Sequence, residues 1–308
     1  MTSTATEPLN RALTLGGSDV AGVLGISPFR TPLDVWREKC LGQRDTIDTP
    51  GTRAGTRFEP HVLAAYAAKL PEGSTVTKPE PTLRGHLRAS PDGIATVRGW
   101  PRLVEIKTTV FAQDWGVTDS EDVPLHYAVQ AMWYLDLLEL EEADFPVLLW
   151  PYEMRDLLGL TPPEIVAKCE VRTLRLGYSP SMARMLREAV DRFWNDHVLP
   201  QVPPPAVDLE DIKRLVHAVR GKTKPIDDDF VRALVERDAA KKLLAEAQRQ
   251  VDAADFKVRT WMGDNESAID PRGNQIATLK RIDKASYVVK AQSYRELRTT
   301  KHWKDLNQ

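Results

Sequence analysis

Four short segments rich in β-branched and apolar residues lie between two helical patterns, and this arrangement limits the folds open to the chain. The segments are TVTKP, TLRGHLRAS, DGIATV and RLVEIKTT, and turns such as PDG and RGWP separate them. Runs of this kind bounded by turn residues are typical of strands, so they predict an antiparallel meander. Helices before and after the meander indicate an α/β or α+β fold with one central mixed sheet flanked by helices.

Capping residues and apolar spacing predict the helices around this sheet. Ser18 is expected to be the N-cap of a short helix over 19–25. Residues 53–69 place Phe58, Val62 and Tyr66 on one face of a longer helix, and Pro60 is expected to start or bend it. The remaining expected elements are helices over 32–40, 123–138 and 180–198 and strands over 144–150 and 169–176.

Consecutive prolines in QVPPPAVD, at 201–208, cannot continue a helix or a central strand. They predict two domains, a core over 1–207 and a C-terminal region over 208–308. Within the latter, a narrow apolar stripe along 226–263 predicts a helical hairpin or a coiled-coil-like arm. A β-hairpin with a glycine-containing turn is expected after Gly263, and a basic tail ends the chain.

Several classes of protein are excluded by composition. No run of roughly 18 apolar residues exists, so a membrane span is not expected, and the N-terminus lacks a secretion-signal pattern. Cys40 and Cys169 alone cannot supply a disulfide framework, a four-thiolate zinc site or an iron–sulfur cluster. The expected location is therefore the cytoplasm. The absence of a P-loop argues against ATP dependence, and the six histidines show no zinc spacing.

The net charge of −2 conceals an uneven distribution. Residues 1–210 hold 21 basic and 29 acidic side chains, whereas residues 211–308 hold 21 and 15. An acidic body does not suit a protein that coats DNA by charge alone. It is compatible with a carboxylate-rich metal site flanked by a local phosphate-binding surface. An ordinary solvated surface with an uneven tail fits the charge pattern equally well.

Asp92 in SPDG and Glu105 in LVEIKTT are the central candidates for chemistry. Side chains alternate along a strand, so Glu105 and Lys107 are expected on one face, and pairing across the RGWP turn would bring Asp92 near them. Two carboxylates would offer Mg²⁺ hard oxygen ligands, and the lysine could orient or activate a water molecule. The alternative is a routine cross-strand ion pair in a hairpin.

Other candidates lie on the predicted helices. Glu59 could add a third carboxylate, although a solvated helix face explains it equally well. Gln130 lies among apolar residues. It is either a buried amide that needs a hydrogen-bond partner or an ordinary core or surface glutamine. Ser18 and nearby backbone amides, with Arg11 seven residues earlier, suit a phosphate, and simple N-capping is the alternative.

Five motifs, taken in order, resemble those of YqaJ-type viral recombinases, which are relatives of lambda exonuclease in the PD-(D/E)xK nuclease superfamily. They are GGSDVAGVLGISPFRTPLDVWREKCLG, a glutamate-bearing helix, SPDGIA, LVEIKTT and YAVQAMWYL, and the resemblance covers about residues 11 to 200. The resemblance implies a PD-(D/E)xK core with a central mixed sheet. Many relatives have a second glutamine where this chain has Met132.

The resemblance also implies a role for each candidate. Asp92, Glu105 and the backbone carbonyl of Ile106 would bind Mg²⁺, for which Mn²⁺ could substitute. Glu59 would complete a two-metal site, Lys107 would assist the attacking water, and Gln130 would position these groups. Arg11 and Ser18 would hold a DNA phosphate, expected to be the 5′-phosphate.

Such proteins look like 5′→3′ exonucleases that resect linear double-stranded DNA for a single-strand annealing protein. The resemblance implies a phage or prophage gene, a bacterial host cytoplasm and a homo-oligomer, by analogy a toroidal trimer. Two other interpretations stay open: an endonuclease of the same superfamily, and a catalytically silent DNA-binding scaffold whose arm recruits partners. The tail residues Arg295, Arg298, Lys301 and Lys304 either contact DNA backbone or are simply solvated.

Overall fold

Two units make up the chain in the computed structural model, residues 1–216 and residues 217–308. The residues it describes are 13–44, 49–150, 160–215, 223–273 and 275–279. The first unit includes helix α8 (Leu209–Leu215), where Asp211 accepts a hydrogen bond from Thr31 and Arg214 pairs with Asp34. The functional division between 1–207 and 208–308 stays a prediction.

A six-stranded mixed sheet forms the centre of the first unit, which confirms the predicted α/β fold class. Its strands are β1 (Thr75–Thr77), β4 (Gly93–Val97), β5 (Trp100–Val104), β6 (Lys107–Thr109), β7 (Glu142–Leu149) and β8 (Glu170–Gly177). The pairs β1–β4, β4–β5 and β7–β8 are antiparallel, whereas β5 and β6 both run parallel to β7. The strands expected over 144–150 and 169–176 are therefore present as β7 and β8.

The meander prediction is wrong for one segment. TLRGHLRAS forms a separate hairpin of β2 (Thr82–Arg84) and β3 (Leu87–Ala89) instead of joining the sheet. Leu15 forms two backbone hydrogen bonds with the β3 region. Its N–H donates to the carbonyl of His86 (2.7 Å), and its carbonyl accepts from the N–H of Arg88 (2.9 Å). Besides β2, β3 thus has a neighbour from a distant part of the chain, which local sequence does not reveal.

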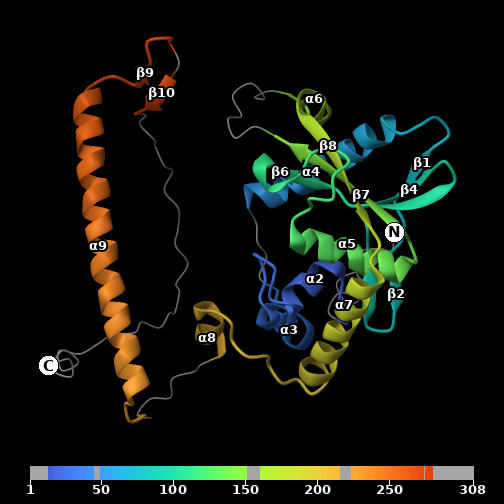
Figure 1. Ribbon diagram of the computed structural model, residues 1–308, viewed down its shortest axis with the longest axis horizontal. Helices are drawn as coiled ribbons and strands as arrows, with labels where there is room; N and C mark the ends of the chain where they lie inside the picture. The colour runs from blue at the N-terminus through green and yellow to red at the C-terminus, as the bar shows by residue number, and fades with distance from the viewer. Residues whose placement is uncertain (1–12, 45–48, 151–159, 216–222, 274, 280–308) are drawn as a thin grey trace. The chain divides into compact units, whose positions relative to one another are not determined.

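Helices cover both faces of the sheet (Figure 1). One face carries α2 (Gly17–Val23), α3 (Pro32–Leu41), α5 (Leu125–Leu138) and α7 (Pro180–Phe193), and the other carries α4 (Pro50–Ala68) and α6 (Pro162–Lys168). Two separate apolar cores result, one containing Trp133 and Phe145 and the other containing Phe58 and Val62. The sequence predictions included neither α6 nor α8.

Helix α4 is one turn longer at its start than the predicted 53–69. Thr49 caps it by accepting a hydrogen bond from the N–H of Thr52 (3.2 Å), and Pro50 occupies the first turn, where a missing N–H costs nothing. Pro60 lies inside the helix rather than at its start, and it is exposed.

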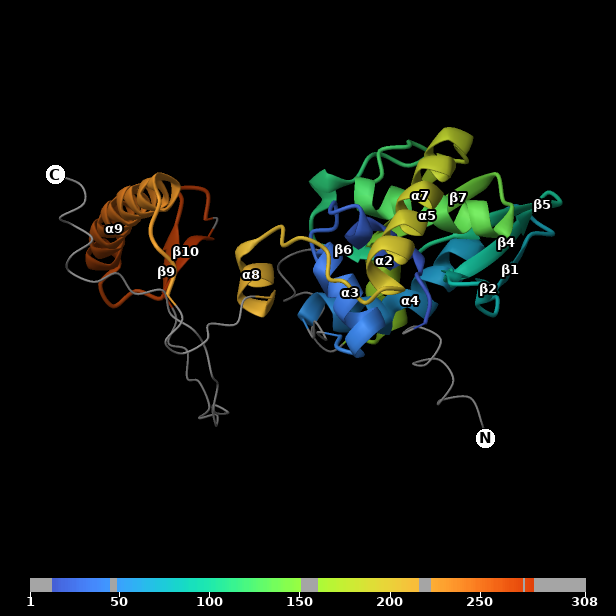
Figure 2. The same ribbon diagram turned by 90° about the horizontal axis from the view of Figure 1, so that it is seen from below.

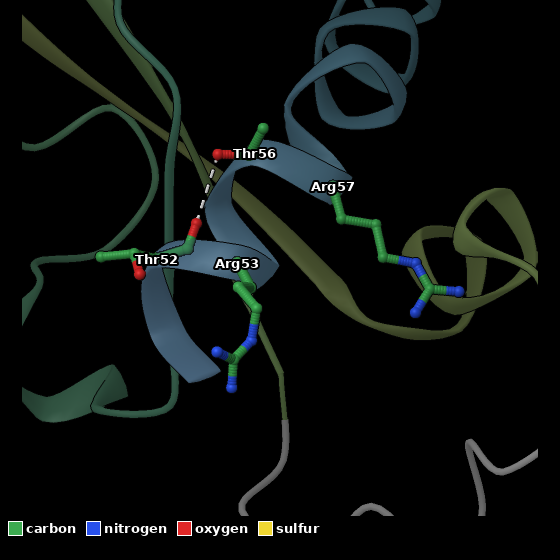
Figure 3. A pocket seen from close by; sticks show the side chains of 4 residues that line it. All are labelled: Thr52, Arg53, Thr56 and Arg57. Atoms are coloured by element: carbon green, nitrogen blue, oxygen red, sulfur yellow. Dashed lines mark hydrogen bonds between the residues drawn. The ribbon is translucent and has the colours of Figure 1, made fainter. Parts of the chain in front are cut away.

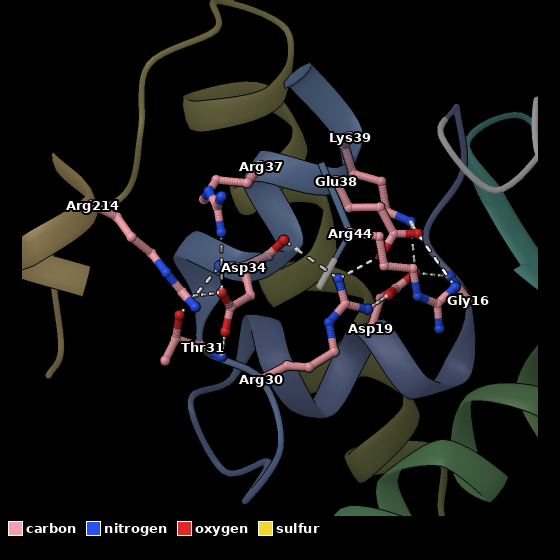
Figure 4. A network of polar contacts seen from close by, with 10 residues as sticks. All are labelled: Gly16, Asp19, Arg30, Thr31, Asp34, Arg37, Glu38, Lys39, Arg44 and Arg214. Carbon is pink, nitrogen blue, oxygen red and sulfur yellow. Dashed lines mark hydrogen bonds and ion pairs between the residues drawn. The ribbon is translucent and has the colours of Figure 1, made fainter. Parts of the chain in front are cut away.

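Helix α2 corrects the prediction for Ser18. The N-cap is Gly16, whose N–H donates to the Asp19 carboxylate (3.0 Å), and Ser18 is an exposed residue of the first turn. A buried charge network then ties α2 to α3 (Figure 4): Lys39 pairs with Asp19 (2.9 Å) and Arg30 pairs with both Asp19 and Glu38. Four charges that neutralise one another fix the helix pair without leaving a buried ion unpaired.

The second unit is built around one long helix. Helix α9 (Asp228–Met262) is continuous in both views (Figures 1 and 2), so the arm is a single helix and not a helical hairpin. The expected β-hairpin follows as β9 (Ser267–Ile269) and β10 (Gln275–Thr278). Among the described helices, none combines the length and the apolar surface that crossing a bilayer requires.

Candidate active site

The pairing of β4 with β5 brings the two central carboxyl groups together. Gly93 is opposite Val104 in the antiparallel register. Asp92 precedes Gly93 and Glu105 follows Val104, so these two residues lie at the same end of the strand pair. The N–H of Ile106 donates to Oδ2 of Asp92 (2.8 Å), which fixes the aspartate beside the end of β5. The predicted convergence of Asp92, Glu105 and Lys107 is therefore present.

The sequence suggested that LVEIKTT is one uninterrupted strand, but the structure divides it into two. β5 ends at Val104 and β6 begins at Lys107, yet both pair with the same edge of β7 in the same register. The N–H of Glu105 donates to the carbonyl of Asp144 (3.0 Å), so the break is short. It leaves Glu105 and Lys107 on one side, with Nζ of the lysine 2.7 Å from Oε1 of the glutamate.

Glu105 is a buried carboxyl group with only one oxygen satisfied. Its Oε1 accepts from Nζ of Lys107 and from Nε2 of Gln130 (2.5 Å), while Oε2 is buried with no hydrogen-bond partner among the described residues. Burial raises the pKa of Glu105 to about 7, although the charge of Lys107 opposes this shift. A buried carboxylate oxygen without a hydrogen-bond donor destabilises the folded protein, and a bound cation would give it a partner.

The neighbouring groups respond to the same burial. It raises the pKa of Asp92 above the usual value, again against the charge of Lys107. Burial alone would lower the pKa of Lys107, but the carboxylates of Glu105 and Asp92 outweigh it and raise that pKa. Lys107 is consequently an ammonium group at neutral pH, able to donate hydrogen bonds but unable to accept a proton.

Helix α5 contributes one face to this cluster. Gln130 holds Glu105, and its Oε1 is also 3.4 Å from Nζ of Lys107. The ring of Tyr127 lies under that ammonium at 4.6 Å, and Tyr134 lies beside Gln130, since a Cβ at Gly17 would touch both side chains. The two tyrosines were not predicted, although their spacing from Gln130, three residues before and four after, places all three on one helix face.

Gly17 on α2 packs directly against this helix face. A Cβ there would lie 2.7 Å from Cε1 of Tyr134 and 2.9 Å from Cγ of Gln130. Glycine to alanine changes within helices usually stabilise by up to about 1 kcal/mol. For Gly17→Ala we expect the opposite, a loss of about 1–3 kcal/mol from overpacking, measured by denaturant unfolding.

Gly51→Ala on α4 is the matched control, because the nearest atom to its Cβ would be Thr49 Oγ1 at 3.6 Å. Its stability should be unchanged or raised. Equal stability changes in the two variants would contradict the close packing of Gly17 on α5.

Glu59 lies near the cluster but faces a lysine. Its Oε1 is 2.9 Å from Nζ of Lys78, and its charge contributes to the raised pKa values of both Asp92 and Glu105. Within the described part of the chain, no three acidic, histidine or cysteine side chains are already grouped as a metal site. The role of Glu59 as a third ligand stays a prediction.

The predicted phosphate-binding pair is only partly described. Arg11 lies outside the described residues, as does the basic tail with Arg295, Arg298, Lys301 and Lys304. Ser18 does line a hollow beside the cluster, which it shares with two arginines that the sequence did not single out, Arg44 and Arg88. The other lining residues are Thr14, Gly16, Asp19, Glu38, Ser90 and Tyr134.

Two comparisons with known proteins find a similarity to the same family. Residues 9–139 match the model of the YqaJ-like viral recombinase domain. The uncharacterized protein YqaJ of Bacillus subtilis (strain 168) is 26% identical over 207 residues, which cover 62% of this chain and 55% of that protein. The chain thus spans about half the length of this curated relative.

Two solved structures are similar to this chain at low sequence identity. An alkaline exonuclease from Laribacter hongkongensis is 17% identical, with 65% of this chain and 94% of that one covered and a TM-score of 0.47. A phage related exonuclease from Haemophilus somnus 129PT is 12% identical, with 63% and 99% covered and a TM-score of 0.46.

Proposed function

We propose that this chain, whose residues 9–139 match the model of the YqaJ-like viral recombinase domain, is a metal-dependent deoxyribonuclease that degrades linear double-stranded DNA from its ends. One observation carries the proposal: the carboxyl groups of Asp92 and Glu105 converge beside the ammonium of Lys107. The family match and this cluster agree, since a recombinase domain of this kind acts on DNA.

The donor set fits a divalent cation. Oε2 of Glu105 is buried with no hydrogen-bond donor among the described residues, and carboxylate oxygens are the ligands that Mg²⁺ prefers. Asp92, Glu105 and the backbone carbonyl of Ile106 would hold the ion, with Glu59 as a further ligand. When bound, Mg²⁺ or Mn²⁺ would polarise the scissile phosphate and lower the pKa of a water molecule.

The side chains around the cation have separate tasks. Lys107 donates hydrogen bonds, so it would orient the attacking water and neutralise charge that develops on the phosphate. Without a bound cation, the carboxylates of Glu105 and Asp92 raise the pKa of Lys107, which agrees with the task of a donor. Gln130 contacts both Glu105 and Lys107, and would therefore hold the two at a fixed separation during the reaction.

Cation binding should depend on pH. The Glu105 carboxyl has to lose its proton before it binds a cation, and its pKa is about 7. Below that pH the affinity for Mg²⁺ should therefore fall by about tenfold per pH unit, and above it the affinity should level off. Calorimetric titrations between about pH 5 and about pH 9 measure this profile.

Glu105→Gln serves as the control for that titration, since it removes the titrating group while keeping the shape of the side chain. A wild-type affinity that is flat across pH 7 would contradict the assignment of Glu105 as a ligand.

The finer parts of the proposal rest on the family resemblance. They are 5′→3′ polarity, 5′-phosphate capture by Arg11 and Ser18, a trimeric ring, a single-strand annealing partner and a phage origin with action in the host cytoplasm. The hollow beside the cluster supports one of them, because Ser18 shares it with Arg44 and Arg88, whose guanidinium groups suit a phosphate.

One assay tests the function. The protein is incubated with end-labelled linear duplexes carrying either a 5′-phosphate or a 5′-hydroxyl, and with a closed circle, with and without Mg²⁺. We expect Mg²⁺-dependent loss of mononucleotides from the linear DNA, faster with the 5′-phosphate, and an intact circle. Cutting of the circle would indicate an endonuclease instead, and no cutting at all would indicate a silent DNA-binding protein.

A further inference from the structure

Helix α9 exposes a line of large apolar side chains along its length. Each of the following residues is between 46% and 76% exposed: Phe230, Leu244, Val251, Val258 and Trp261. Single exposed apolar residues are common on protein surfaces, but a continuous row of them usually marks a contact with another molecule. The row on α9 therefore calls for a partner.

Helix α4 shows the usual pattern of a solvated helix in this chain. Its first turns are lined by exposed polar side chains around a shallow hollow (Figure 3), which are Thr52, Arg53, Thr56 and Arg57. Its apolar side chains, such as Phe58, are buried in a core. On α9 most of the large apolar side chains are exposed instead, so this helix has an apolar surface that its own unit leaves uncovered.

The exposed row on α9 follows a seven-residue repeat. One position of the repeat, called a, holds the larger residues Phe230, Arg237, Leu244, Val251 and Val258. The position three residues later, called d, holds Ala233, Ala240, Ala247, Ala254 and Trp261. Residues at a and d form the seam of a two-stranded coiled coil. The seam of α9 therefore consists of large side chains that alternate with alanine.

An antiparallel second copy complements this seam along its full length. When residue 228 of one helix lies beside residue 263 of the other, each a position faces a d position. Leu244 then faces Ala247 of the second copy, and Val251 and Val258 also face alanines. At both ends Phe230 faces Trp261 of the second copy, which allows two aromatic rings to pack. Large side chains thus meet small ones, as close packing requires.

The charges beside the seam also fit an antiparallel second copy. In the same register Glu236 of each helix lies near Lys257 of the other, which gives two pairs of opposite charge. Neither side chain forms an ion pair within the described residues, although other charged residues of α9 do. A parallel pair would instead place Arg237 of both helices together inside the seam, where like charges are costly.

The helix is long enough for a specific contact. Its 35 residues span about 52 Å at 1.5 Å per residue. A contact strip of that length and about 10 Å wide covers about 500 Å² on each helix, so a pair buries about 1,000 Å² or more. Specific protein interfaces begin at about this size.

We infer that α9 is a self-association arm, whose exposed seam packs antiparallel against the seam of α9 from a second copy of this chain. The inference goes beyond the proposed function, because it uses no residue of the candidate active site. Loss of nuclease activity would leave it standing, and loss of pairing would leave the nuclease standing.

Cysteine cross-linking of the full chain tests both the contact and its direction. In the antiparallel register position 240 of one helix faces position 251 of the other, and helices packed at about 8–10 Å bring facing Cα atoms within disulfide range. Ala240→Cys with Val251→Cys should therefore give a covalent dimer on mild oxidation, read on a denaturing gel without reductant. The two positions lie about 16 Å apart along one helix, so no bond forms within a chain.

Single variants report the direction of the pair. In the antiparallel register each position lies about 16 Å along the axis from its own copy, so Ala240→Cys alone and Val251→Cys alone should stay monomeric on the gel. Dimers from both single variants would indicate a parallel pair. A dimer yield in the double variant no higher than in wild type would indicate no pairing. Either result overturns the inference.

A matched pair of sites controls for random collision. Ala239→Cys with Ala253→Cys introduces two exposed cysteines on α9 away from the seam, and should stay monomeric on the gel. The wild-type protein, whose own cysteines are Cys40 and Cys169, gives the background. Dimers from the Ala239 and Ala253 variant at the yield of the seam variant would also overturn the inference.

A charge exchange tests the register. In the seam-cysteine variant, Lys257→Glu places like charges together twice, so the protein concentration that gives half-maximal cross-linking at low salt should rise about threefold to tenfold. Glu236→Lys with Lys257→Glu exchanges the charges and should restore the original concentration. An unchanged concentration in Lys257→Glu, or no recovery in the exchanged variant, would overturn this register.

Discussion

Glu105→Gln should nearly abolish the degradation of linear duplex DNA, while DNA affinity stays within about twofold of wild type. The substitution removes a charged ligand whose Oε2 is buried without a hydrogen-bond donor among the described residues. Cation chemistry supplies several kcal/mol of transition-state stabilisation, which corresponds to a rate loss of about 10³-fold or more. DNA affinity is retained because phosphate contacts elsewhere supply most of it.

Single-turnover rates with saturating protein and Mg²⁺ measure the first effect, and binding in EDTA measures the second. Glu105→Ala should behave in the same way. Glu188→Gln removes an exposed carboxylate from α7 and should cut DNA at the wild-type rate. A Glu105 variant that degrades DNA at the wild-type rate would refute the assignment of this carboxylate to the reaction.

Lys107→Met should lower the single-turnover rate by about 10²–10³-fold, the usual effect of losing one preorganised donor to the developing charge. Methionine keeps much of the side-chain volume over the Tyr127 ring but has no ammonium to place beside Glu105. The proposed donor keeps its proton throughout the reaction, so the loss of rate in Lys107→Met should be the same at every pH at which the wild-type protein cuts DNA.

Lys168→Met, an exposed position on α6, is the control and should leave the rate unchanged. A fall in the wild-type rate that begins near neutral pH and disappears in Lys107→Met would indicate that the lysine acts as an acid or a base. A wild-type rate in Lys107→Met would remove it from the mechanism altogether.

The approach of Asp92 to Glu105 was predictable because it depends on local pairing. The RGWP turn joins two adjacent segments, and antiparallel pairing of neighbours needs no distant information. The same reasoning failed for TLRGHLRAS, whose β3 has a partner, Leu15, far away in the sequence. It also missed the break at Glu105 and Ile106, since an apolar run does not indicate where a strand is interrupted.

Helix ends were predictable only where the capping residues decide them. Thr31 and Pro32 define the start of α3, and this boundary agrees with the predicted 32–40. Ser18 also has a good capping side chain, but the N–H of Gly16 donates to the Asp19 carboxylate and α2 starts earlier. Glycine has no capping side chain, so the preference for Ser18 at an N-cap misplaced this start.

The second unit shows a similar limit. An apolar stripe is equally consistent with a helical hairpin and with a long helix, and the sequence of α9 has no glycine or proline between Asp228 and Met262 to end the helix. That absence of a breaker was a usable signal for one continuous helix.

The most direct test is to locate the cation. Crystals of the wild-type protein grown with Mn²⁺ and measured for anomalous scattering should give a peak at about 2.1 Å from an oxygen of Asp92 and from Oε2 of Glu105. The peak should disappear in Glu105→Gln crystals grown in the same way. An empty position between these two carboxylates at saturating Mn²⁺, in a protein that still degrades linear DNA, would contradict the proposed centre.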